Sequence, residues 1–231
     1  MQISSGFLKV GAWGAFFSAL TTATLMYGPN PPAPDGFDAI QQLHANSLHL
    51  YKKWVLFLHP QFAFLAAVAT AWFLAKRSPA LAAMALFYLA IWTITEMSQQ
   101  AYLIDALNQM WRPAYLAAPE EQKQMWQTLI MGMRGISDSQ YFIVVFCFGV
   151  GSILMGAALY QQGGQARPLG AINFAIGVMS LLAFASYYTG LLEAGPLVQA
   201  WYGWIYGPLQ VGARGWLGWW LYTESRSLTS S

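Results

Sequence analysis

Residues 79–105 read PALAAMALFYLAIWTITEMSQQAYLID, a stretch that joins an apolar first half to a polar second half. The first half is apolar enough for the interior of a lipid bilayer. The second half contains Glu96, which is the only acidic residue inside any hydrophobic segment of the chain, since Asp105 stands at the very end of this stretch. Because a carboxylate at membrane depth is costly, it usually faces a bundle interior or a hydrated cavity. This stretch therefore predicts both a membrane helix and a polar pocket beside it.

The composition of the whole chain points to the same class of protein. Of its 231 residues, 57% are hydrophobic and only 9% are charged, and the mean hydropathy is +0.41. Soluble domains contain about 25% charged residues, so we expect an integral membrane protein in contact with the lipid bilayer. The net charge of +2 is too small to suggest a nucleic-acid partner. We predict an all-α, polytopic helix bundle that forms a single domain over residues 1–231.

Six hydrophobic segments have about the 20 residues that a helix needs to cross a bilayer. The first is expected to be a retained anchor, because only Lys9 precedes its apolar run and no small-x-small cleavage site follows it. A very short link at Ser78 and Pro79 makes the second and third segments an antiparallel hairpin. The six predicted transmembrane segments are residues 7–27, 54–75, 79–105, 141–160, 168–189 and 197–222.

Two amphipathic helices are predicted in the long polar regions, outside the spans. Residues 37–51 place apolar side chains near helical spacing and contain two of the three histidines. Residues 118–133 begin with a proline and two glutamates, which is typical of a helix start. We expect Gly132, Arg134 and Gly135 to end this second helix, which would lie on the membrane or cover the bundle as a lid.

Lysines and arginines in the short loops indicate the orientation. If both termini are cytoplasmic, five of these residues lie on each side, so the raw count is a tie. Lys76 and Arg77 occupy a very short loop, whereas those on the other side lie in long loops that also contain acids. We therefore expect cytoplasmic N- and C-termini. The two groups are Lys9, Lys76, Arg77, Arg167 and Arg226 inside, and Lys52, Lys53, Arg112, Lys123 and Arg134 outside.

Depth along the segments brings several polar residues together. At about 1.5 Å per residue, Glu96 lies roughly 25 Å along its segment and His59 roughly 8 Å into its own. Because the two helices are antiparallel and the hydrocarbon core is about 30 Å thick, both fall at similar depth, in the outer half. Thr93 and Gln100 share one helix face with Glu96. The predicted ligand-binding residues are Glu96, His59, Thr93, Gln100, Tyr187, Tyr188, Tyr202 and Tyr206.

Three functions are compatible with such a pocket. The first is a membrane protein that binds a small molecule or lipid, as a sensor, carrier or accessory subunit. The second is an intramembrane lipid-modifying enzyme, an isomerase or hydrolase, with Glu96 as acid/base and His59 as its partner; these are the candidate catalytic residues. The third is a structural or assembly subunit in which Glu96 only ties helices together. Replacing Glu96 by glutamine distinguishes the enzyme from the binding protein, because an amide abolishes proton transfer but keeps most hydrogen bonds. A structural role predicts that the substitution alters only stability or the retention of partners.

Recognised chemical motifs are missing from the sequence, and no cofactor is indicated. No HExxH, GxSxG, Walker A or GxGxxG motif occurs in a fitting context. Three histidines and the lone Cys147 are too few for a multi-histidine metal site, so none is predicted, and the absence of CxxCH excludes covalent c-type haem. Arg214 lies about 25 Å along the last segment, where we expect it to reach the opposite interface.

Glycine patterning carries the one resemblance to a known family. Residues 148–178 read FGVGSILMGAALYQQGGQARPLGAINFAIGV and resemble the fourth and fifth helices of a bacterial family of six-helix membrane proteins of unknown function. The similarity covers about half of the chain and implies a multi-pass protein of the bacterial inner membrane, with no catalytic residue to carry over. Gly203 and Gly207 form a GxxxG motif, which allows close helix contact and suggests a homo-oligomer.

Overall fold

The computed structural model describes residues 4–190 and 200–228, and every regular element in these two ranges is a helix. This confirms the predicted all-α class. The elements are α1 (Ser5–Tyr27), α2 (Phe37–Gln41), η1 (Gln42–Ala45), α3 (Ser47–Leu74), α4 (Pro79–Tyr102), η2 (Leu103–Trp111), α5 (Arg112–Ala117), α6 (Glu120–Gln162), α7 (Ala166–Phe184), η3 (Ala185–Thr189), η4 (Tyr202–Tyr206) and α9 (Gly207–Ser227).

Four helical stretches are long and apolar enough to cross a membrane. They contain the second to fifth segments expected from the sequence. The first and last predicted segments are represented by α1 and by η4 with α9, which are long enough but not apolar enough to count among these stretches in the described residues. The four stretches are Ser47–Leu74, Pro79–Ala117, Glu120–Gln162 and Ala166–Thr189.

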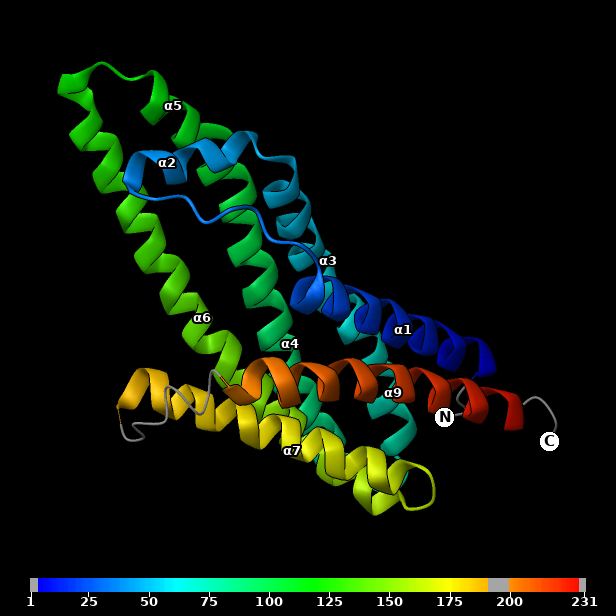
Figure 1. Cartoon of the computed structure of the whole chain (residues 1–231). Coiled ribbons are helices and arrows are strands. Elements are labelled where there is room, and N and C mark those ends of the chain that lie inside the picture. Colours follow the sequence, from blue (N-terminus) through cyan, green and yellow to red (C-terminus); the bar gives the residue numbers. More distant parts are fainter. Residues whose placement is uncertain (1–3, 191–199, 229–231) are drawn as a thin grey trace.

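The helices form two groups that cross each other (Figure 1). Helices α3, α4 and α6 run steeply through the molecule, and α6 packs against both α4 and α7. Helices α1 and α9 lie side by side across the lower half, with α1 also packed on α3. The start of α1 and the end of α9 lie near each other at one end of this pair (Figure 1). Such a crossing leaves room between the groups, where the cavity described below is found.

Helix α6 is one continuous helix of 43 residues. The expectation that a separate helix ends at Gly132, Arg134 and Gly135 is therefore wrong. Each helical glycine costs only about 1 kcal/mol relative to alanine, and contacts with α4 and α5 hold this part of α6 in place. At 1.5 Å per residue α6 is about 65 Å long, roughly twice the thickness of the hydrocarbon core. Its first half therefore extends beyond any bilayer that its apolar second half crosses.

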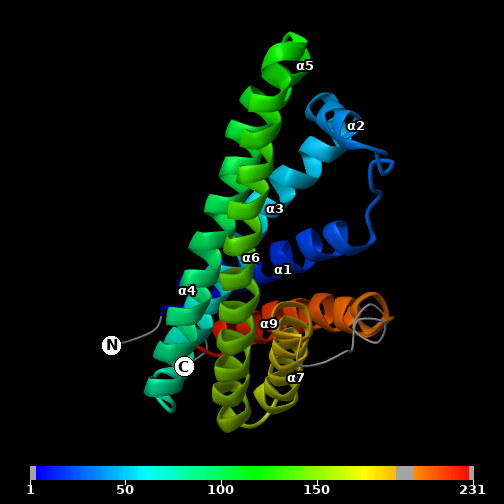
Figure 2. The same ribbon diagram turned by 90° about the vertical axis from the view of Figure 1, so that its left-hand side faces the viewer.

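The polar region between α4 and α6 is a helical hairpin and not a loop. The chain continues from α4 through the π-helix η2 into α5, and α6 returns beside it (Figures 1 and 2). The hairpin has its own apolar cluster around Leu107, Tyr115 and Ile130. Helix α2 packs on it through Phe37, whose ring lies 5.3 Å from that of Tyr115. This cluster explains why a stretch of modest hydropathy is ordered.

A single amphipathic helix over residues 37–51 is also not found. The chain forms α2 and the short 3₁₀ turn η1, and α3 then begins at Ser47. Asn46 caps α3, because its side-chain oxygen accepts a hydrogen bond from the His49 backbone N–H at 2.9 Å. Asparagine is among the strongest N-cap residues. The break therefore follows from a capping signal that the apolar spacing of residues 37–51 conceals.

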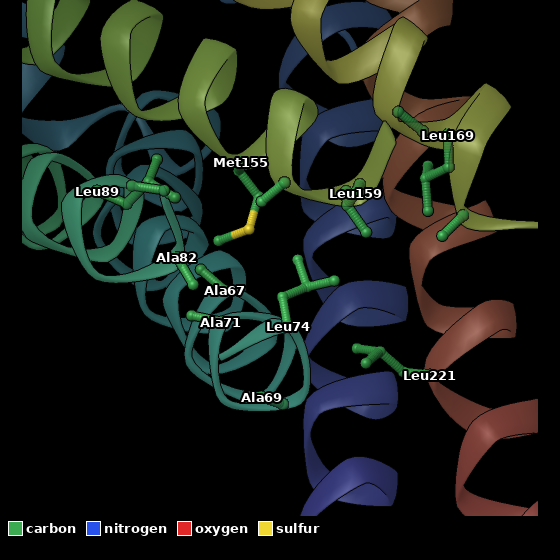
Figure 3. Packing of buried hydrophobic residues seen from close by; sticks show 14 of the residues in the cluster. Ala67, Ala69, Ala71, Leu74, Ala82, Leu89, Met155, Leu159, Leu169 and Leu221 are labelled. Carbon is green, nitrogen blue, oxygen red and sulfur yellow. The ribbon is translucent and has the colours of Figure 1, made fainter. Parts of the chain in front are cut away.

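The core is built from leucines and small residues where the two groups meet. Figure 3 shows Leu74, Leu159, Leu169 and Leu221 gathered there, all fully buried. Alanines of α3 and α4 face the same cluster, and their size lets the helices approach closely.

Glycines bring α6 and α7 into backbone contact. A Cβ added at Gly156 would lie 2.5 Å from the Phe174 nitrogen, and one at Gly170 would lie 2.4 Å from the Tyr160 nitrogen. No side chain fits there without moving a helix. In the GxxxG pair, by contrast, a Cβ at Gly207 would meet the Tyr27 hydroxyl of α1 at 2.7 Å, while Gly203 has open space. Gly207 thus packs within its own chain.

Replacing Gly135 by alanine is expected to stabilise the protein by about 0.5–1 kcal/mol. Gly135 lies inside α6, and an added Cβ would meet nothing within 4 Å. Gly163 is the matched control, since it ends α6 at a φ of 80°, where alanine is strained and destabilises. Thermal unfolding in detergent compares the two variants with the parent protein. A helix that ended at Gly135 would be destabilised by the alanine.

Candidate functional site

A cavity of about 370 Å³ lies between α1, α3, α4, α6, α7, η3, η4 and α9. We call it the polar cavity. Apolar and aromatic side chains make up part of its wall, including Leu25, Val144 and Met179. Its polar lining residues are Thr22, His59, Glu96, Tyr141, Ser180, Tyr187, Tyr188, Tyr202, Tyr206, Gln210 and Arg214. The mixture of apolar wall and a few polar groups is typical of a small-molecule site.

Most of the residues predicted from the sequence meet at this cavity. Glu96 and His59 line it together with all four predicted tyrosines. Thr93 and Gln100 do not line it: the Thr93 hydroxyl donates to the Leu89 carbonyl at 2.8 Å, and the Gln100 amide donates to Gln99 Oε1 at 3.3 Å. At about 100° per residue, both lie on the flank of Glu96 away from Trp92. The cavity lies on the flank of α4 that carries Trp92, which lines it together with Glu96.

His59 is held by hydrogen bonds on both ring nitrogens. The Thr21 hydroxyl donates to the backbone carbonyls of Phe17 and Ser18, at 2.9 and 3.0 Å. It therefore accepts the 2.9 Å hydrogen bond from His59 Nδ1, and His59 Nε2 accepts from Arg214 Nη1 at 2.8 Å. This pattern is that of a neutral imidazole with its proton on Nδ1. The expected partnership between His59 and Glu96 is thus replaced by one between His59 and Arg214.

Arg214 points into the bundle and does not reach the opposite interface, so that expectation is wrong. Its Nη1 donates to Ser18 Oγ at 2.5 Å as well as to His59, and its Nη2 donates to Gln210 Oε1 at 2.9 Å. Among the described residues no carboxylate lies within 4 Å of it. Three of its five N–H groups are thus used by neutral partners. The remaining capacity and the charge are available to the cavity.

Glu96 lies on another wall of the same cavity and is only 9% exposed. The Trp92 side chain, one turn earlier on α4, and the more distant charge of Arg214 both favour its charged form. Glu96 and Arg214 are not in contact, since no ion pair within 4 Å joins these two described residues. A buried carboxylate with so few donors is incompletely satisfied. Its free oxygen lone pairs favour a bound cationic or hydroxyl group, or water.

Aromatic rings form the rest of the polar wall. The Tyr206 and Ser180 hydroxyls are hydrogen-bonded at 2.6 Å, and the Tyr202 ring stacks on Tyr206 with centroids 4.9 Å apart. Tyr188 packs edge-on against Tyr187 at 4.7 Å. Its buried hydroxyl has no hydrogen-bond partner among the described residues. Tyr187 is 75% exposed, so this aromatic wall leads from the interior to the outside of the bundle.

Arg214 also lines a smaller, neighbouring cavity of about 70 Å³. Trp92, Phe148, Gln210 and Arg214 line both. The sequence carries a signal for this arrangement: Tyr206, Gln210 and Arg214 recur every four residues, which places them on one helix face. Such a polar stripe in an otherwise apolar, tryptophan-rich segment indicates a face that is turned inward.

No metal site is found in residues 4–190 and 200–228, where no three histidine, cysteine, aspartate or glutamate side chains converge. The fold and the cavity together define a helical, membrane-type protein with a charged pocket inside its bundle. Comparison of the chain with protein-family models, curated proteins and solved structures gave no match. The geometry of the cavity is therefore the basis for inferring a function.

Proposed function

We propose that this chain is a multi-pass membrane protein that binds a small amphipathic molecule or lipid in the polar cavity. The observation that carries the proposal is the pair Glu96 and Arg214. These opposite charges line the same 370 Å³ cavity without touching each other. Buried charges are normally paired, so a ligand bound between Glu96 and Arg214 would supply the missing partner of each. Such a protein would serve as a sensor, carrier or accessory subunit.

The ligand class follows from the wall of the cavity. Arg214 has N–H groups to spare and suits a carboxylate or phosphate oxygen, since guanidinium groups bind oxyanions with good geometry. Glu96 suits an ammonium or hydroxyl group. The apolar wall around Leu25, Val144 and Met179 suits a hydrocarbon chain. A zwitterionic or hydroxylated head group with an apolar tail therefore matches the cavity better than a purely polar solute.

The proposed membrane arrangement has six transmembrane spans. Four stretches meet the length and hydropathy of a span by themselves. Helices α1 and α9 would be the other two, because they pack along each other and α1 also packs on α3. Their polar residues, Ser18 and Arg214 among them, face each other and lower the mean hydropathy without facing lipid. The resemblance based on residues 148–178 implies the same count.

The enzymatic alternative depends on Glu96 working with His59. Both ring nitrogens of His59 are engaged by Thr21 and Arg214, so a direct Glu96–His59 proton relay would need these bonds to break. A binding function needs no such change. The geometry therefore favours binding over catalysis.

Filling the cavity tests the proposed function. Ala183 lines the polar cavity, and Ala183→Trp is expected to displace any bound molecule. The molecules that co-purify with the protein are extracted and identified by mass spectrometry of lipids and metabolites. Ile94→Trp is the control, because Ile94 is 65% exposed on the outside of α4. A compound present in the parent and the control but lost in Ala183→Trp is expected. Identical profiles for all three proteins would contradict the proposal.

The proposed orientation places both termini in the cytoplasm, and labelling of single cysteines tests it. Asp35 and Glu120 lie in or beside the hairpin end, with Asp35 lining the same surface pocket as Tyr115. In a Cys147→Ser background, Asp35→Cys and Glu120→Cys are each expected to react with a membrane-impermeant thiol reagent in intact cells. Reaction only after the membrane is opened would reverse the orientation.

A further inference from the structure

Three basic side chains line another cavity, where the hairpin meets the start of α3. Lys53 comes from α3, Arg112 from α5 and Arg134 from α6. We call this space, of about 240 Å³, the basic cavity. Asp138 is the only carboxylate among its described lining residues. The lining therefore carries three positive charges against one negative charge, and it is separate from the polar cavity.

These three cations have no counter-charge in contact. Among the described residues no carboxylate lies within 4 Å of any of them. Lys53 and Arg112 repel each other, and so do Arg112 and Arg134. Arg112 is only 7% exposed, and its Nη1 donates to Asn108 Oδ1 and to His49 Nε2, both neutral partners. Because like charges held together are unfavourable, the arrangement favours a bound anion.

Unpaired polar atoms surround the same cavity. Asn108 Nδ2 and Arg112 Nε are buried donors without a partner among the described residues, and Gln41 Oε1 is a buried acceptor without one. All three residues line the basic cavity. Buried polar atoms in proteins are nearly always hydrogen-bonded, so each of these indicates a missing partner. An oxyanion would accept from both donors, and a hydroxyl of the same ligand would donate to Gln41.

The position of the basic cavity matches the level of lipid phosphates. Arg134 precedes Tyr141 of the polar cavity along α6, and Lys53 precedes His59 along α3. Each offset corresponds to about 10 Å of helix, directed towards the projecting hairpin. Head groups lie just outside the hydrocarbon core, and lysines and arginines beside a membrane segment attract them. Two guanidinium groups also suit the geometry of a phosphate.

We infer that the basic cavity is a binding site for a phosphate group, held by Lys53, Arg112 and Arg134. The phosphate belongs either to a lipid head group or to a soluble phosphate ester. This site does not depend on the ligand of the polar cavity.

Arg134→Gln tests this inference without endangering the fold, because Arg134 is exposed and has no carboxylate within 4 Å among the described residues. The matched control is Lys123→Gln, which removes the same charge from α6 but lies outside the basic cavity, beside Glu120 at 3.1 Å. In one arm, inorganic phosphate is titrated into the full-length protein in neutral detergent at constant ionic strength. In the other, the thermal midpoint is compared in phosphatidylcholine vesicles with and without phosphatidylglycerol.

Stabilisation in at least one arm is expected for the parent protein and for Lys123→Gln. In Arg134→Gln the affinity for the stabilising compound should fall about tenfold, as for the loss of one charged hydrogen bond. Stabilisation by phosphatidylglycerol alone assigns a lipid head group, and stabilisation by inorganic phosphate assigns a soluble ester. Absence of stabilisation in both arms would overturn the inference. An equal loss in Lys123→Gln would overturn it too, because it would show a general charge effect.

Discussion

Gly170→Val is expected to lower the free energy of unfolding by about 3 kcal/mol, at the upper end for an overpacked core position. A Cβ at Gly170 would lie 2.4 Å from the Tyr160 nitrogen and 2.6 Å from the Gly156 carbonyl oxygen. These are backbone atoms of α6, which cannot rotate away as a side chain does. The α6–α7 hairpin would have to separate, and Leu159 and Leu169 would lose part of their packing.

Gly132→Val is the matched control for this substitution. Gly132 lies in α6 with nothing within 4 Å of an added Cβ, so the same valine should be tolerated there. Thermal or denaturant unfolding of the purified protein in detergent measures both variants. If both variants have the same stability, the glycine contact between α6 and α7 does not hold these two helices together.

The second large effect is expected at Glu96 and Arg214. Arg214→Gln leaves Glu96 without a cation facing it and removes the donors to His59 and Ser18. Leaving buried acceptors such as these without their donor typically costs about 1–3 kcal/mol. Glu96→Gln removes the carboxylate that faces Arg214 across the cavity, so the Arg214 charge is left unopposed and a loss of stability is expected there too. The double variant should lose less than the sum of the single losses, because no uncompensated charge remains.

The coupling of His59 to each of the two charged residues gives a further comparison. It is hydrogen-bonded to Arg214 at 2.8 Å, so a double-mutant cycle between them should give a coupling of about 1–3 kcal/mol. The coupling between His59 and Glu96, which share the cavity without a hydrogen bond in the described structure, should be smaller. Strictly additive losses for Glu96 and Arg214 would mean that the two charges do not act on each other across the cavity.

Hydropathy and helical depth predicted much of this arrangement. The all-helical class and the second to fifth segments follow from apolar runs that a membrane requires. Glu96 and His59 were expected to share a cavity with Tyr187, Tyr188, Tyr202 and Tyr206, and all six residues line it. This agreement rests on the short link between α3 and α4, which makes them antiparallel neighbours and fixes relative depth.

The features that were not predicted depend on competition between weak local signals and packing. Gly132 and Gly135 resemble a helix end. Helix α6 nevertheless continues, because its contacts with α4 and α5 outweigh the small cost of glycine in a helix. Asn46 breaks the helix expected over residues 37–51 by capping α3. Distance along the segment alone predicts that Arg214 reaches the opposite interface. Which way it turns is decided by Ser18 and His59, which belong to other helices and lie far away in the sequence.

Native mass spectrometry of the intact protein tests the central claim most directly. The protein is released from detergent, and bound molecules appear as added mass. The account predicts one discrete adduct on the parent protein that is retained in Lys123→Gln, whose charge lies outside the polar cavity. The same adduct should be lost or strongly reduced in both Glu96→Gln and Arg214→Gln. Glu96→Gln and Arg214→Gln variants that keep every adduct of the parent protein, or a parent protein that carries none, would contradict a ligand held between Glu96 and Arg214.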